Sequence, residues 1–152
     1  VDDEGAPSVV EYNVRFGDPE TQVTIPLIES DLGEMLLAAA EGRIENYQAI
    51  FSNKSAVTVV LASEGYPGAS KTGREITGEN TRIEEGEIIA FVHQAGTHRN
   101  EDGKLLSSGG RVLSATAVAS DLPSAVGAAY AIIDEITLQG SHYRRDIAYR
   151  AL

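Results

Sequence analysis

Residues 111–136 read RVLSATAVASDLPSAVGAAYAIIDEI, and this stretch predicts a strand followed directly by a helix. Residues 111–118 are apolar and β-branched, as is typical of a buried strand. Ser120 or Asp121 is suited to cap the helix, because a short polar side chain accepts the free N–H groups of a first helical turn. Apolar residues then recur at helical spacing, namely Leu122, Ala125, Val126, Ala129, Ile132, Ile133 and Ile136. We therefore expect a helix that packs one face against a sheet.

The segments just upstream supply further strands for this sheet. Residues 56–62, AVTVVLA, form a nearly continuous apolar run that indicates a buried strand, and residues 87–92 indicate a shorter one. Residues 63–74 contain three glycines and a proline and are expected to form a loop. Residues 97–110 are polar and contain Asp-Gly and Gly-Gly pairs, which favour a hairpin.

The N-terminal third differs in character. Residues Ser8–Val14 predict a strand, and residues Arg15–Gln22 predict a charged turn. A helix should follow with Ser30 as its N-cap and Gly42 just past its end. Its expected apolar stripe is Leu32, Met35, Leu36 and Ala39. The polar stretch from Glu45 to Asn53 is the best candidate for a domain boundary.

Composition narrows the class of protein. The chain has 152 residues, of which 42% are hydrophobic, and a formal net charge of −11. Such an acidic chain repels phosphate backbones, so we expect no nucleic-acid partner. Its apolar runs are much shorter than the roughly 20 residues of a membrane span, so we expect no such span. The absence of cysteine fits a reducing compartment, and the expected location is cytoplasmic. The chain begins at Val1 rather than Met, so we expect part of the protein to lie upstream.

A metal site is one interpretation of the first predicted strand. Glu11 and Asn13 are two residues apart, so the period of a strand places both on one face, and Arg15 continues that face. Carboxylate and amide oxygens are ligands that Mg²⁺ takes together with substrate phosphates. The alternative is the solvated edge of a sheet, which the spacing alone does not distinguish.

An anion site is one interpretation of Gly109, Gly110 and Arg111. Backbone N–H groups of a glycine pair and a neighbouring guanidinium can surround a phosphate. The alternative is a glycine turn that carries a surface arginine. No pair of histidines has the spacing of metal ligands.

Residues 15–22, RFGDPETQ, resemble the signature octapeptide of glycinamide ribonucleotide synthetases. The preceding Glu11-Tyr12-Asn13 is similar to the metal strand of that family. Further family-like blocks follow in order: VVLASEGYPG at 59–68, AGT at 95–97, GGRVL at 109–113, an alanine-rich helix at 125–130 and YRRDIAYRAL at 143–152. The chain departs from the family pattern F-H-A-G-T, because His93 is displaced by one residue. The resemblance therefore assigns His93 no role.

The resemblance implies a reaction and a set of site residues. An ATP-grasp domain would activate glycine as glycyl phosphate, and the amine of 5-phosphoribosylamine would attack it to give glycinamide ribonucleotide, ADP and phosphate. It implies ATP as a substrate and Mg²⁺ or Mn²⁺ as the cofactor. Glu11 and Asn13 would be the metal ligands and Arg15 would face the phosphates. Asp18 and Glu20 would orient glycine or the attacking amine, unless they only shape the turn.

The expected fold is α+β, with two parts. Residues 1–48 would be the C-terminal end of an ATP-grasp domain, and residues 49–152 would be a small β-rich C-terminal domain with a packed helix. The partners would be glycine, 5-phosphoribosylamine, ATP and the remainder of the ATP-grasp and N-terminal domains. Two other hypotheses stay open: another ATP-grasp ligase or carboxylase, and a non-catalytic module of a multifunctional purine enzyme.

Overall fold

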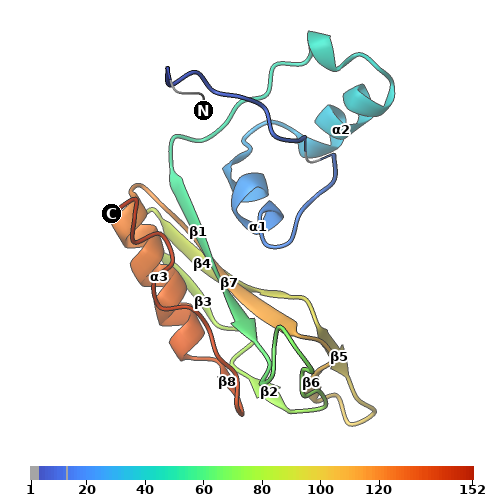
Figure 1. The fold of residues 1–152 in the computed structure, drawn as a ribbon, viewed down its shortest axis with the longest axis vertical. Coiled ribbons are helices and arrows are strands. Elements are labelled where there is room, and N and C mark those ends of the chain that lie inside the picture. Colours follow the sequence, from blue (N-terminus) through green and yellow to red (C-terminus); the bar gives the residue numbers. More distant parts are fainter. Residues whose placement is uncertain (1–3, 13) are drawn as a thin grey trace.

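A four-stranded antiparallel sheet with one long helix forms the body of the molecule (Figure 1). The computed structural model describes residues 4–12 and 14–152. The sheet has the order β1-β7-β4-β3, from β1 (Ser55–Ala62), β7 (Arg111–Ala119), β4 (Ile88–Gln94) and β3 (Arg82–Glu85). The strands expected near 56–62, 87–92 and 111–118 are thereby confirmed. We call residues 55–152 the sheet domain.

Two small ribbons extend the sheet domain. The hairpin expected within 97–110 is present as β5 (Thr97–Arg99) and β6 (Leu105–Ser107). A second ribbon pairs β2 (Ile76–Thr77) with β8 (Thr137–Leu138), neither of which the sequence analysis foresaw. Strands of two residues carry too little periodicity to be read from sequence.

Helix α3 (Leu122–Asp134) covers one face of the sheet. Its N-cap is Asp121, whose side chain accepts the Ser124 N–H at 2.8 Å. Of the two candidates predicted from the sequence, Ser120 and Asp121, the second is therefore confirmed. The helix packs close because the sheet presents small residues, Ala115 and Ala117, to it. Five residues of the expected apolar stripe are buried, namely Ala125, Ala129, Ile132, Ile133 and Ile136. The other two, Leu122 and Val126, are partly buried and pack against the core.

The C-terminal tail returns along α3 (Figure 1). The Tyr130 hydroxyl donates to the Arg144 carbonyl at 2.8 Å and accepts the Ile147 N–H at 3.1 Å. Tyr143 and Ile147 pack against the core. The tail is therefore part of the sheet domain.

The N-terminal segment, which we define as residues 4–53, contains short helices. They are α1 (Thr21–Thr24), η1 (Ile25–Leu27), α2 (Leu32–Ala40) and η2 (Ile44–Asn46). The predicted turn is present at residues 18–20, and α1 begins within its last residues. Figure 1 shows this segment beyond one end of the sheet, with α1 near β1.

The strand predicted at Ser8–Val14 is wrong for every residue of it that the structure describes. Residues 8–12 and 14 are irregular and exposed. A strand needs a neighbouring strand for its backbone N–H and C=O groups, and the four-stranded sheet does not extend to this segment. β-branched residues alone therefore did not suffice.

The N-cap predicted for α2 is also wrong. Asp31 caps the helix and accepts the Glu34 N–H at 2.9 Å. The Ser30 hydroxyl instead accepts the Ile50 N–H at 2.6 Å. This bond ties the segment around Ile50 to the residue just before the helix. Gly42 follows the helix end with φ +70°, as expected. The predicted stripe is rotated, because Leu36 and Ala39 are exposed whereas Ala38 is buried.

No helix among the described residues is long and apolar enough to cross a membrane.

Candidate active site

The octapeptide forms a tight turn that leads into α1. The Thr21 N–H donates to the Gly17 carbonyl at 3.1 Å, and the Gln22 side-chain amide donates to Asp18 Oδ1 at 2.8 Å. The Glu20 side chain folds over Gly17 so closely that a Cβ at that position would collide with its carboxylate. A larger residue at position 17 would therefore push the Glu20 carboxylate out of this position.

The glycine pair before β7 is held by the loop that follows β1. The Ser63 N–H donates to the Gly110 carbonyl at 2.8 Å, and the Ser63 hydroxyl donates to the Gly109 carbonyl at 3.0 Å. A Cβ on Gly110 would run into the Tyr66 ring and lie 2.9 Å from Ser70 Oγ. Within the described chain, the N–H groups of Gly109 and Gly110 have no acceptor.

Arg111 joins this glycine pair to the octapeptide. Its Nε atom lies 3.1 Å from Asp18 Oδ2, and the two side chains are 42% and 40% exposed. Two sets of site residues that the sequence predicted separately are thus brought together. The Nη1 and Nη2 groups of Arg111 have no acceptor among the described residues, whereas its Nε faces Asp18 Oδ2.

A cleft of about 380 Å³ lies between the octapeptide and the end of β4. It is lined by Phe16, Gly17, Thr21, Gln22, Ile25, Pro26, His93 and Gln94. The alternation of strand residues places His93 on the face of the sheet opposite α3, and residues 16–26 lie over that face. The octapeptide and the sheet domain therefore share a small concave surface.

His93 is a partly buried residue at this cleft. Its Nε2 atom is buried and has no hydrogen-bond partner among the described residues. Burial lowers the pKa of His93 below its ordinary value, because the imidazolium is the form that loses hydration. Its ring meets the Phe91 ring edge-on, with centroids 4.9 Å apart. We therefore expect His93 to be neutral at pH 7.

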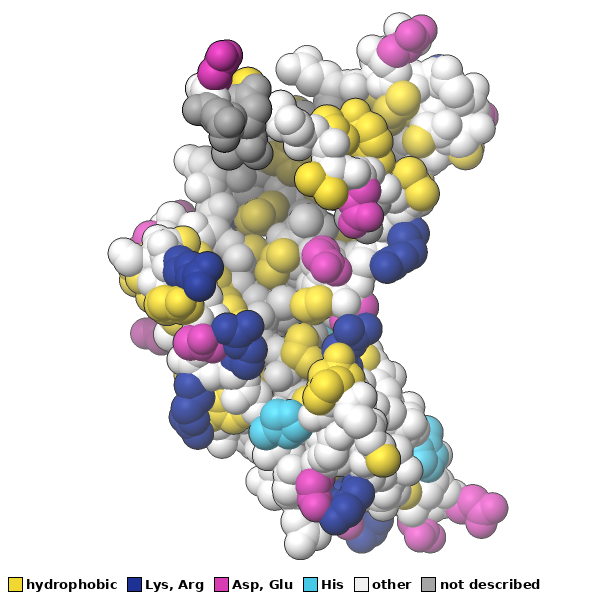
Figure 2. All heavy atoms as spheres, in the orientation of Figure 1, with side chains coloured by type: hydrophobic (Ala, Val, Ile, Leu, Met, Phe, Trp, Pro, Cys, Tyr) yellow, Lys and Arg dark blue, Asp and Glu magenta, His cyan; other side chains and the backbone are white. Residues whose placement is uncertain are grey.

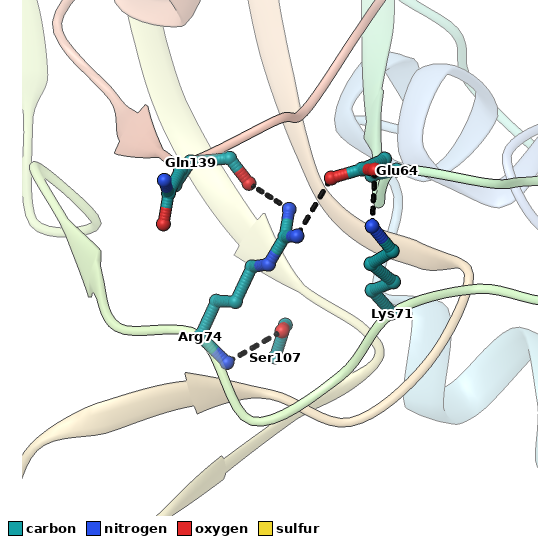
Figure 3. A network of polar contacts seen from close by, with 5 residues as sticks. All are labelled: Glu64, Lys71, Arg74, Ser107 and Gln139. Carbon is teal, nitrogen blue, oxygen red and sulfur yellow. Dashed lines mark hydrogen bonds and ion pairs between the residues drawn. The ribbon is translucent and has the colours of Figure 1, made fainter.

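A polar network fixes the loop at residues 63–74 (Figure 3). Glu64 accepts from Lys71 Nζ at 2.5 Å and from Arg74 Nη2 at 2.6 Å, while Arg74 Nη1 donates to the Gln139 carbonyl at 2.5 Å. The hydrogen bonds from Lys71 and then Arg74 lower the pKa of Glu64. The network thus anchors the loop that carries Ser63 and Tyr66 to the turn after β8.

The other predicted site residues lie apart from these contacts. Glu11 is exposed, and no contact among the described residues links it to Asp18 or Arg111. Asn13 lies outside the described residues. Arg15 is exposed and donates to the Phe16 carbonyl at 3.2 Å. The described residues contain no group of three or more His, Asp or Glu side chains that could hold a metal ion.

Sequence reasoning missed three residues that shape the site. Gln22 holds Asp18, and Ser63 and Tyr66 enclose the glycine pair. Gln22 closes the octapeptide, four residues after Asp18, which is one turn of a helix and would have signalled the contact. No comparable signal links Ser63 to Gly109, because that contact depends on the pairing of β1 with β7.

Comparison with known proteins gives consistent matches. A family model described as phosphoribosylglycinamide synthetase, C domain, matches residues 56–150. A phosphoribosylamine–glycine ligase of Chlorobaculum tepidum is 48% identical over 150 residues, which are 99% of this chain and 35% of the relative. A bifunctional purine biosynthetic protein of Dictyostelium discoideum is 44% identical over 95% of this chain and 18% of its own length. The chain therefore spans about a third or less of these relatives.

A solved structure agrees with the fold. The phosphoribosylamine–glycine ligase of Thermotoga maritima superposes with a TM-score of 0.70 and 36% identity. The match covers 94% of this chain and 34% of that one.

Proposed function

The chain belongs to the phosphoribosylglycinamide synthetase family, and from this membership we propose that it works as part of a phosphoribosylamine–glycine ligase of purine biosynthesis. The complete enzyme would use ATP to activate glycine as glycyl phosphate. The amine of 5-phosphoribosylamine would then attack the acyl phosphate and form glycinamide ribonucleotide, ADP and phosphate. The observation that carries the proposal for this chain is the 3.1 Å ion pair between Asp18 of the octapeptide and Arg111 of the sheet domain.

We assign the phosphate of the phosphosugar to Gly109, Gly110 and Arg111. Two N–H groups without acceptors and a guanidinium with free donors supply the hydrogen bonds that a phosphate takes. Ser63 supports the assignment by holding both glycine carbonyls, which fixes the direction of the backbone at this point.

We assign the chemistry of the acyl transfer to the octapeptide. Arg15 is exposed and its guanidinium would stabilise charge on the transferring phosphoryl group or the acyl phosphate. Asp18 and Glu20 lie on the same turn, and their carboxylates would orient glycine or the attacking amine. The cleft beside them would enclose part of the substrate.

Glu11 and Asn13 would hold Mg²⁺ or Mn²⁺. One carboxylate and one amide oxygen fit an ion that takes its remaining ligands from substrate phosphates and water, and the exposure of Glu11 is compatible with such a shared site. When bound, the ion would neutralise charge on the nucleotide phosphates.

We propose that residues 1–48 are the C-terminal end of an ATP-grasp domain and that residues 49–152 are the C-terminal domain of the enzyme. Large apolar side chains are exposed in the first part, among them Val10, Val14 and Leu37. Figure 2 shows apolar side chains at the surface of this end of the molecule. The remainder of the ATP-grasp and N-terminal domains would cover them. The absence of cysteine supports work in the reducing cytoplasm.

The test is turnover by the complete ligase that carries this chain. ADP should be released only when glycine and phosphoribosylamine are both present, and bicarbonate should not replace glycine. Bicarbonate-dependent turnover would instead identify a carboxylase. The 152-residue chain alone should release no ADP, because most contacts to the nucleotide would come from the remainder of the enzyme.

The metal assignment has its own test in the complete ligase. Glu11→Gln and Asn13→Leu should each lower kcat by about two orders of magnitude or more, because the phosphates lose their neutralising ion. Asn13→Asp should be milder, since it keeps an oxygen ligand. Turnover is measured against Mg²⁺ concentration, with circular dichroism as the control for folding. Near-normal metal dependence in the first two variants would place the ion elsewhere.

A further inference from the structure

Both carboxylate oxygens of Asp18 are engaged in the structure. Oδ1 accepts from the Gln22 side-chain amide at 2.8 Å, and Oδ2 lies 3.1 Å from Arg111 Nε. Gln22 belongs to α1, which follows the same turn, so the carboxylate is held in place from its own segment while it faces the sheet domain. Gln22 therefore holds the Asp18 carboxylate in position, with its negative charge beside the Arg111 guanidinium.

That fixed charge opposes the binding of a simple anion. The free donors of Gly109, Gly110 and Arg111 favour an oxyanion, but an oxyanion that reaches Arg111 also approaches the Asp18 carboxylate. Like charges a few ångströms apart repel each other, more strongly so where the site excludes water. An oxyanion binds well only if the same ligand gives Asp18 a replacement for Arg111.

We infer that Asp18 is a specificity-determining residue that selects phosphosugars carrying an amine. Such a ligand offers its phosphate to Gly109, Gly110 and Arg111 and donates an amine N–H to the Asp18 carboxylate, in place of the contact from Arg111. A phosphosugar with a hydroxyl in place of the amine breaks the contact between Arg111 and Asp18 and gives Asp18 only a weaker hydrogen-bond donor instead. Inorganic phosphate breaks the same contact and gives Asp18 no donor. This inference rests on the proposed function and adds to it the reason for the choice of substrate.

The pair is partly exposed, which sets the size of the effect. Exposed ion pairs contribute up to about 1 kcal/mol, which corresponds to a factor of about five in a dissociation constant. Removal of the Asp18 charge should therefore tighten the binding of a phosphosugar without an amine by about two- to fivefold. The same change should weaken the binding of phosphoribosylamine.

The experiment compares two ligands on the complete ligase. Calorimetry gives the dissociation constant of ribose 5-phosphate, which has a hydroxyl where phosphoribosylamine has its amine, and steady-state kinetics give the KM of phosphoribosylamine. Asp18→Asn should lower the first and raise the second. Asp18→Glu should keep the discrimination in part, since glutamate retains the negative charge. Asp102→Asn, in the exposed turn between β5 and β6, is the control, because it also removes one negative charge. It should change neither the dissociation constant of ribose 5-phosphate nor the KM of phosphoribosylamine.

Asp18→Ala provides a second removal of the charge if thermal unfolding shows that Asp18→Asn does not fold. Unchanged or weaker binding of ribose 5-phosphate in the folded variant would overturn the inference, because it would mean that Asp18 does not oppose the anion. A failure of the proposed function is a separate result: the wild-type enzyme would then release no ADP with glycine and phosphoribosylamine.

Discussion

Single residues fix the geometry around the glycine pair, and Gly110 is the tightest of them. An alanine there would press its Cβ into the Tyr66 ring and against Ser70 Oγ. Such overpacking costs about 1–3 kcal/mol, so Gly110→Ala should lower the free energy of unfolding by that amount. Urea unfolding followed by circular dichroism measures it.

The matched control lies in α3. Gly127 is exposed within the helix, and nothing lies within 4 Å of a Cβ added there. Gly127→Ala should stabilise the protein by up to about 1 kcal/mol, because alanine has the higher helix propensity. If both alanines had the same effect, contact with Tyr66 would not be the cause.

His93 gives the protein a pH dependence near neutrality. Burial lowers its folded pKa below the ordinary value of 6.5, so the unfolded chain binds more protons than the folded chain as the pH falls below that value. The free energy of unfolding should therefore decrease from about pH 7 downward until the pH reaches the folded pKa. His93→Gln should remove this decrease, while His98→Gln, at an exposed position, should keep it. Identical pH profiles for wild type and His93→Gln would contradict the prediction.

At the residue scale, the sequence predicted two separate sets of site residues, the octapeptide and the Gly-Gly-Arg run, and their membership of one functional site stays a prediction. Their contact could not be predicted, because Asp18 and Arg111 are far apart in the chain and meet only through the packing of the N-terminal segment on the sheet. The position of His93 at the cleft depends on the same packing.

At the scale of elements, prediction succeeded where a segment carried both periodicity and its own end signals. Helix α3 has a long apolar stripe, an N-cap at Asp121 and a strand directly before it. The strand predicted at Ser8–Val14 rested on its β-branched valines and had no end signals, and without a neighbouring strand the described residues 8–12 are irregular. For α2, two adjacent residues could serve as the cap, and the hydrogen bond from Ile50 to Ser30 decided between them.

The cap of α3 should titrate. The backbone N–H of Ser124 and then its hydroxyl lower the pKa of Asp121, because they stabilise the carboxylate. A carboxylate with a lowered folded pKa stabilises the fold above its ordinary value of 3.8, and that contribution is lost as the pH falls through the folded pKa. The stability difference between wild type and Asp121→Ala should therefore be largest at neutral pH and shrink in acid.

Asp121→Asn is the control for this effect. Asparagine is a good N-cap that does not titrate, so the variant should keep most of the stability at neutral pH and lose less of it in acid. Unfolding by urea at several pH values between 3 and 7 would separate the three proteins. A constant difference between wild type and Asp121→Ala over this range would show that the charge of Asp121 contributes nothing.

At the scale of the whole molecule, stability is unevenly distributed. The hydrophobic core cluster is built from residues between Val57 and Leu138, all in the sheet domain. In the described part of the N-terminal segment, Ala38 is the one fully buried residue. The α+β class followed from the sheet domain, whereas the N-terminal segment has too small a core for its sequence to decide its structure alone.

This distribution predicts that residues 54–152 fold without the N-terminal segment. Their core is complete within that range, so a chain restricted to them should unfold cooperatively, with Tm changed by less than about 8 °C, the shift for roughly 1 kcal/mol in a domain of this size. Removal of residues 141–152 instead should lower Tm by more, because Tyr143 and Ile147 pack on the core and Tyr130 bonds to the tail. Calorimetry on both truncated chains and on the 152-residue chain makes the comparison. If residues 54–152 did not fold, contacts such as the Asp18–Arg111 ion pair would contribute far more stability than their exposure implies.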